Sequence, residues 1–213
     1  LLVGNRATYG GAAGYGTLAR CALEDNVAHY GGGFYGDKYN GGAMENCVVS
    51  GNAGVLGGGA CGGTLRNCTI TGNSAEDGGG VYGGGIHGGK AYNTIVAGNA
   101  ASAGATNVQN YVLDHGCSEP VQPGTGNIAV PATLFIDAAN GDFRLAPGSP
   151  CIDAGANDQA PAGADLDGFP RIVNGTVDLG AYEHLANIPA TFDPGPGESP
   201  DPSSKLVTYL QPY

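Results

Sequence analysis

CVVSGNAGVLGGG, at residues 47–59, returns 21 residues later as CTITGNSAEDGGG at residues 68–80. Each copy contains a short run of β-branched residues, an Asn and a block of glycines. The same Asn recurs at Asn5, Asn26 and Asn99, so successive spacings are 21, 26, 21 and 26 residues. A repeat of this length is typical of a solenoid in which each repeat forms one coil and buries its inner face against its neighbours. The sequence therefore predicts an all-β fold, a parallel β-helix.

The run before each Asn predicts a strand, because β-branched residues fit a pleated, half-buried surface. Side chains alternate along a strand, so one column should face the interior and the other should face solvent. We expect the Asn to take the left-handed conformation at a corner, which it tolerates better than most residues. The inward column should hold Cys21, Leu23, Cys47, Val49, Cys68, Ile70, Thr94 and Val96. The outward column should hold Ala22, Val48, Thr69 and Ile95.

Composition excludes several classes of protein. The 213 residues include 41 glycines, and a glycine inside a helix costs about 1 kcal/mol relative to alanine, which argues against an α-rich fold. Eight basic and 19 acidic residues give a net charge of −11, which disfavours nucleic acid as a partner. No apolar run approaches the roughly 20 residues that span a bilayer. This composition suits a secreted protein.

The repeat also suggests how the chain is divided. We expect β-helix coils over 1–105, a continuation and irregular C-terminal cap over 106–186, a linker rich in Pro, Asp and Ser over 187–204, and a tail strand over 205–213. Two coils carry five extra residues, around 34–40 and 81–87. Since insertions in a repeat form loops on one face, both should leave the solenoid on the same side.

The sequence after the repeats carries its own motifs. GNI at 126–128, DFRLAPGSPCIDAG at 142–155, DLDG at 165–168 and DLGAYE at 178–183 resemble the C-terminal end of the choice-of-anchor Q family. The repeats themselves are similar to the polymorphic outer-membrane type of repeat. The resemblance implies a right-handed parallel β-helix that is exported and tethered to a bacterial surface. It implies no activity.

The cysteines fall into two groups. Cys21, Cys47 and Cys68 share one inward column, where we expect free thiols that pack as small hydrophobic groups. Cys117 and Cys151 lie in the irregular region, where an exported protein can form a stabilising disulfide between them. No Cys-x-x-Cys spacing indicates a zinc or redox site.

Calcium is the one cofactor that the acidic residues suggest. Asp165 and Asp167, followed by Gly168, resemble the start of a calcium loop, and Asp178 could add oxygen donors. The alternative is that these carboxylates accept hydrogen bonds from turn amides.

A catalytic constellation is not indicated. The outward column has almost no acidic residues, and the four histidines share no column. Aromatic and charged residues gather instead near the two insertions, and aromatic rings can stack on sugars or pack against a protein partner. They are Tyr35, Lys38, Tyr39, Tyr82 and His87. The alternative is that the tyrosines cover corners of the core.

The expected function is a non-enzymatic structural or adhesive protein, secreted and associated with a cell surface. The chain opens inside a repeat with Leu1, Leu2 and Val3, which predicts an uncapped edge. A strand on a linker can add itself to such an edge, so copies of the protein, or a neighbouring domain, could join head to tail into a fibre. The apolar residues of that tail strand are Leu206, Val207, Tyr209 and Leu210. The alternative is a polysaccharide-binding or polysaccharide-cleaving, lyase-like β-helix protein, with glycans as partners.

Overall fold

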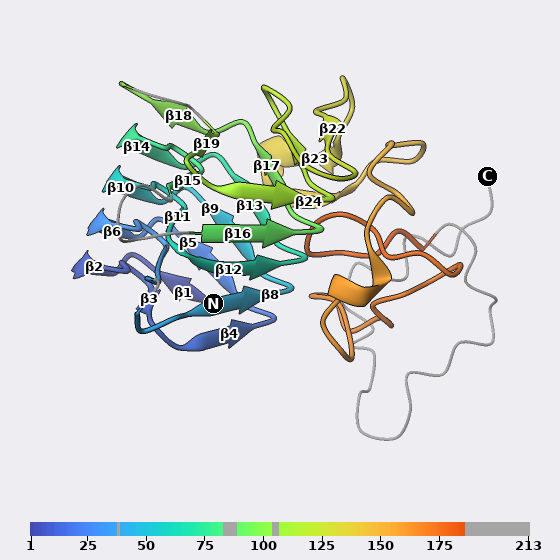
Figure 1. The fold of residues 1–213 in the computed structure, drawn as a ribbon, viewed down its shortest axis with the longest axis horizontal. Coiled ribbons are helices and arrows are strands. Elements are labelled where there is room, and N and C mark those ends of the chain that lie inside the picture. Colours follow the sequence, from blue (N-terminus) through green and yellow to red (C-terminus); the bar gives the residue numbers. More distant parts are fainter. Residues whose placement is uncertain (38, 83–88, 104–106, 186–213) are drawn as a thin grey trace.

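The computed structural model describes residues 1–37, 39–82, 89–103 and 107–185, and it shows a parallel β-solenoid of about five turns. Figure 1 shows the coils stacked on one another, with the N-terminus in the first coil at one end of the stack. The expected linker at 187–204 and tail strand at 205–213 lie outside the described residues. No helix among the residues described is long and apolar enough to cross a membrane.

Four parallel sheets, named A to D here, run along the stack. Sheet A contains β1 (Leu2–Val3), β5 (Ala22–Glu24), β9 (Val48–Ser50), β13 (Thr69–Thr71), β17 (Ile95–Ala97), β21 (Cys117–Ser118) and β22 (Ile128–Ala129). Sheet B contains β2 (Arg6–Tyr9), β6 (Val27–Tyr30), β10 (Ala53–Leu56), β14 (Ser74–Asp77) and β18 (Ala100–Ala101). Sheet C contains β3 (Ala13–Gly14), β7 (Phe34–Tyr35), β11 (Ala60–Cys61), β15 (Val81–Tyr82) and β19 (Val108–Gln109). Sheet D contains β4 (Thr17–Ala19), β8 (Ala43–Glu45), β12 (Gly63–Arg66), β16 (Gly89–Tyr92) and β20 (Val112–Asp114).

The inward column of sheet A matches the prediction. Leu23 pairs in register with Val49, Val49 with Ile70, and Ile70 with Val96, and all four side chains are buried. They form one core with the interior residues of the other sheets, including Phe34. The two longer connections both join a sheet C strand to a sheet D strand.

The repeated Asn does not take the left-handed conformation, and this prediction was wrong. The residue before it does so instead: Gly4, Asp25, Gly51, Gly72 and Gly98 all have φ between 53° and 69°. This turn directs the Asn side chain into the solenoid. Asn26, Asn52 and Asn73 are essentially inaccessible to solvent.

Inside the solenoid these side chains form a hydrogen-bonded ladder. The Oδ1 atom of Asn73 accepts the backbone N–H of Asn52 at 3.0 Å and its Nδ2 at 2.9 Å. The Asn73 amide in turn donates to Oδ1 of Asn99 at 2.9 Å. The ladder ends on Asn107, whose amide donates to the Glu119 carbonyl at 2.7 Å. The repeated Asn therefore satisfies buried backbone groups from coil to coil.

The glycine blocks allow the backbones of adjacent coils to approach closely. A Cβ at Gly58 would lie 2.4 Å from the Ser74 carbonyl oxygen and 2.5 Å from that of Gly79. No side chain larger than hydrogen fits there.

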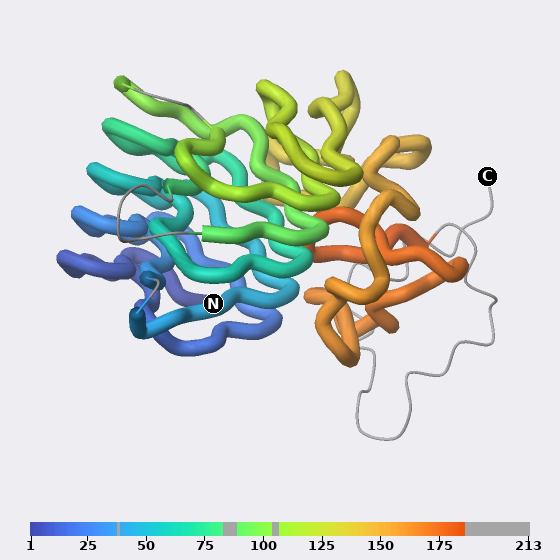
Figure 2. The backbone as a smooth tube through the Cα atoms, viewed as in Figure 1, coloured from blue at the N-terminus to red at the C-terminus, as the bar shows by residue number. Residues whose placement is uncertain are grey.

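The C-terminal region packs along the side of the solenoid, as Figure 2 shows. Its regular elements are an antiparallel pair, β23 (Phe135–Asp137) and β24 (Asp142–Leu145), and two short 3-10 helices, η1 (Ala138–Asn140) and η2 (Asn157–Gln159). This cap covers the outward face of sheet A. Thr69 and Ile95 are each only 1% exposed, and the Thr69 hydroxyl accepts the Ala181 N–H at 3.1 Å.

A second Asn column anchors the cap. Asn46, Asn67 and Asn93 precede the sheet A strands and have φ of 47–52°. The Asn67 amide donates to the Asp178 carbonyl at 2.9 Å, and the Asn46 amide donates to the Ala164 carbonyl at 2.9 Å. Asn93 both donates to and accepts from the backbone of Ala156, at 3.0 and 2.7 Å. These residues hold a second set of left-handed corners, at the start of the sheet A strands.

Candidate functional site

The face on which the sequence analysis sought a catalytic constellation is covered. Val48, Thr69 and Ile95 do point outward, but the cap buries them. Ile95 forms a second core with Cys117, Leu145, Cys151 and Leu179. The cap therefore covers these three positions of the central coils.

The predicted calcium ligands are engaged within the cap. The Asp165 carboxylate accepts N–H groups of Phe169 and Glu183, both at 2.8 Å. The Asp178 carboxylate accepts N–H groups of Asp153 and His184. Burial raises the pKa of both groups, against the lowering effect of these hydrogen bonds. This arrangement agrees with the turn-amide interpretation.

Asp167 lies apart from this pair, with its carboxylate 4.0 Å from the Arg144 guanidinium. Within the described ranges no group of three or more His, Cys, Asp or Glu side chains could hold a metal ion. Calcium binding stays a prediction that the geometry does not support.

A buried ion pair, which sequence reasoning missed, links the cap to the coils. Arg171 is 2% exposed; its guanidinium donates to Glu183, to the Asn46 side chain at 3.1 Å and to the Gly180 carbonyl at 3.1 Å. Burial raises the pKa of Glu183 to about 7, although Arg171 opposes the shift. Asn46 and Arg171 are 125 residues apart, so no local pattern reveals their contact.

All six cysteines are free thiols in the structure, so the predicted Cys117–Cys151 disulfide is not formed in it. The two thiols are nevertheless neighbours. Their hydrogen bond raises the pKa of Cys117 above its usual range and lowers that of Cys151. The inward thiol column is confirmed: Cys47 donates to the Glu45 carbonyl at 3.2 Å, and Cys68 does the same to Arg66 at 3.3 Å.

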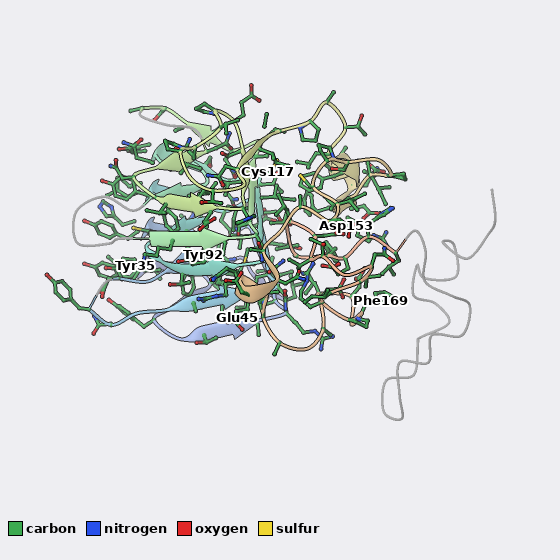
Figure 3. All side chains as sticks on the ribbon, turned by 45° about the vertical axis from the view of Figure 1, so that its right-hand side comes forward. Tyr35, Glu45, Tyr92, Cys117, Asp153 and Phe169 are labelled. Atoms are coloured by element: carbon green, nitrogen blue, oxygen red, sulfur yellow. The ribbon has the colours of Figure 1, made fainter. Side chains whose placement is uncertain are left out.

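The predicted aromatic surface is only partly present. Tyr39 is 72% exposed, but Tyr35 is buried and Tyr82 is half-buried, while Lys38 and His87 lie outside the described residues. For Tyr35 the alternative, a ring that covers the core, is therefore correct. Figure 3 shows Tyr35 on the side of the stack away from Asp153 and Phe169 in the cap.

The exposed rings nearby belong to Tyr9 and Tyr15 of the first coil, which the sequence analysis did not single out. Tyr9 stacks on Tyr30 with centroids 5.1 Å apart and planes 8° from parallel. Tyr15 meets Tyr35 edge to face at 5.2 Å. The 21-residue spacing of Tyr9 and Tyr30, one repeat period, was the signal that could have identified them.

Two separate open pockets lie between the cap and the corner where sheets A and B meet, with volumes of about 510 and 380 Å³. The first is lined by Glu24, Asp25, Ser50, Gly51, Phe143 and residues 139–141. The second is lined by Thr71, Ala97, Gly98, Ala138 and residues 130–135. Both pockets are lined partly by the cap, and sequence reasoning did not foresee that the cap folds back onto the coils.

The first coil forms one end of the described stack. β1, β2, β3 and β4 are each the end strand of their sheet. Four large side chains of this coil are well exposed, with accessible fractions of 76% for Leu1, 51% for Val3, 49% for Tyr9 and 43% for Tyr15. Leu2 and Leu18 are only partly buried, in contrast to the same columns in later coils.

Comparison with protein-family models, with curated proteins and with solved structures finds no match. The fold therefore defines the class of this protein, a β-solenoid consistent with a parallel β-helix. The finer resemblance to the choice-of-anchor Q family rests on the motifs alone.

Proposed function

We propose that this chain is a non-enzymatic structural or adhesive protein that associates with copies of itself along the solenoid axis. The first coil, where one end of all four sheets lies, carries the proposal. Unpaired backbone groups and exposed apolar side chains on an edge strand form a template for another strand. Exposed apolar side chains of this coil lie on β1, at Val3, and on β2, at Tyr9.

The two ends of the stack are suited to each other. β18, β19 and β20 end sheets B, C and D at the far side, just as β2, β3 and β4 end them at the near side. Contact between unlike ends is heterologous and does not close on itself, so repetition gives a filament. The tail segment over 205–213, for which the sequence predicts a strand that includes Leu206 and Val207, is a second proposed way to cover the same edge.

The proposed location is the outside of a bacterial cell. It rests on the resemblance of residues 126–183 to the exported, surface-tethered family. It is also supported by the acidic composition, with a net charge of −11.

Electron microscopy and light scattering over a range of protein concentrations test the assembly. We expect filaments or a mass that grows with concentration. A Val3→Lys and Tyr9→Lys double variant should stay monomeric, because lysine on an edge strand opposes pairing. Ile172→Lys, at an exposed position in the cap, is the matched control and should assemble normally. A native chain that stays monomeric throughout overturns the proposal.

Polysaccharide binding or cleavage is the second candidate, and the first pocket favours it. Carboxylates, a hydroxyl and an aromatic ring line this pocket: Glu24, Asp25, Ser50 and Phe143. Retention on immobilised polysaccharides tests binding, and release of shorter fragments from them tests cleavage.

A further inference from the structure

We propose that the end of the cap is a mechanical clamp, which transmits a pull on the chain beyond residue 185 to three coils in the middle of the stack. The inference rests on the proposed structural or adhesive role, because such a protein has to withstand pulling, but it does not depend on self-association. The sequence after residue 185 is rich in Pro, Asp and Ser, a composition typical of an extended linker through which a pull can arrive.

The last part of the cap, residues 178–184, lies against successive coils. Figure 2 shows the orange to red end of the described chain beside the middle of the stack. The Asp178 carbonyl accepts the Asn67 amide at 2.9 Å, and the Gly180 N–H donates to the Asn93 carbonyl at 2.8 Å. Asn67 and Asn93 precede β13 and β17, which are neighbours in sheet A. A pull on this segment is therefore shared by at least two coils.

Arg171 extends the clamp to a third coil. Its guanidinium pairs with the Glu183 carboxylate and donates to Oδ1 of Asn46 at 3.1 Å. The two side chains of the ion pair are only 2% and 1% exposed, so water does not compete for these contacts. Asn46 precedes β9, and β9, β13 and β17 are the third to fifth of the seven strands of sheet A.

The point at which the pull enters is itself fixed. The Glu183 N–H donates to the Asp165 carboxylate at 2.8 Å, and the His184 N–H donates to the Asp178 carboxylate at 2.5 Å. A buried polar network whose members are paired is rigid. A pull on residue 185 therefore acts on the whole network and not on one hydrogen bond.

A pull on an end coil would act differently. Each coil of a solenoid contacts only its neighbours, so a strand at the end can be peeled away one hydrogen bond at a time. In the described part of the chain, β20 ends sheet D and β22 ends sheet A on the far side. The contacts of the clamp lie on different coils, and they have to break together.

Single-molecule force spectroscopy on the full chain tests the proposal. One handle is attached to an azide-bearing amino acid at position 90, where Lys90 is exposed on sheet D, and the other is attached at the C-terminus. We expect a single rupture that releases the cap, residues 131–185, and lengthens the chain by at most roughly 190 Å. With the second handle moved to position 121, where Val121 is exposed between β21 and β22, the coils should unravel in smaller steps at lower force.

Variants test the contacts of the clamp. Asn67→Gly removes one contact and keeps the corner, because glycine adopts the left-handed φ of 47° freely. The lifetime of the clamp at constant force should fall about tenfold, the equivalent of about 1.4 kcal/mol, because a buried carbonyl loses its donor. Thr69→Val is a second, milder variant that removes only the hydroxyl that accepts the Ala181 N–H, and it should also shorten the lifetime. Asn110→Gly is the matched control: Asn110 has a φ of 53° and is exposed, so it does not lie under the cap.

The outcomes separate the clamp from the self-association. Release of the cap in several small steps, or unchanged lifetimes in both Asn67→Gly and Thr69→Val, overturns the clamp. Monomeric protein that ruptures in one step overturns the proposed self-association and supports the clamp. Filaments whose subunits release the cap in small steps overturn the clamp alone.

Discussion

Truncation of one rung of the Asn ladder should destabilise the solenoid far more in the middle than at its end. Asn73 is 1% exposed, and its Oδ1 accepts the backbone N–H of Asn52. Its Nδ2 donates to the Val49 carbonyl at 2.9 Å and lies 2.9 Å from Oδ1 of Asn99. Asn73→Ala removes these partners without opening the site to water.

The magnitude follows from the groups left unpaired. The Asn52 N–H and the Val49 carbonyl both lose a partner, and each unsatisfied buried group costs about 1–3 kcal/mol. We therefore expect Asn73→Ala to lower the free energy of unfolding by about 4 kcal/mol. Asn5→Ala is the control, because Asn5 is exposed and donates to Asn26 without accepting from a further rung among the described residues. The Asn5→Ala variant should lower the free energy of unfolding by about 1 kcal/mol.

Equilibrium urea unfolding, followed by circular dichroism, measures both losses. The midpoint should shift and the slope should stay constant if the native fold is retained. The reasoning is refuted if the two variants lose free energies of unfolding that agree within about 1 kcal/mol. Burial of an Asn side chain would then not determine how much it stabilises the fold.

Three further predictions concern the cap and the glycines. Oxidation should join Cys117 to Cys151 and raise stability by about 4 kcal/mol for a 34-residue loop. Intact-protein mass spectrometry after alkylation, and melting with and without reductant, check this; Cys117 and Cys151 that both remain alkylatable after oxidation contradict it. The free energy of unfolding should fall as pH rises from about 4.5 to about 7, because the pKa of Glu183 is higher in the folded protein than in the unfolded chain. Ionisation of this buried carboxyl group therefore destabilises the folded state. Glu183→Gln should flatten that fall in urea titrations at several pH values; an unchanged slope argues against it. Gly58→Ala should cost more than about 2 kcal/mol, whereas Gly16→Ala, with open space around it, should be nearly neutral in thermal melts.

The cap shows why part of the fold could not be predicted. Residues after 130 have no period, and their partners lie far away in sequence: Asn67 and Asp178 are 111 residues apart. The sequence analysis placed Thr69 and Ile95 in the outward column, facing solvent. The alternation of side chains along a strand predicts which way a side chain points, but it does not predict which other part of the chain covers that face. The two pockets beside the cap depend on the same long-range packing, so the sequence could not show which residues line them.

The sequence by itself determined the solenoid, because a repeat of 21 or 26 residues places Leu23, Val49, Ile70 and Val96 in one buried column whatever the rest of the chain does. Only the tertiary structure decided which corner residue turns left-handed, that the ladder Asn points inward, and that the cap lies along sheet A. The physical reason is the range of the interactions. Stacking between coils repeats at a fixed separation and leaves a pattern, whereas the packing of the cap joins unique residues once.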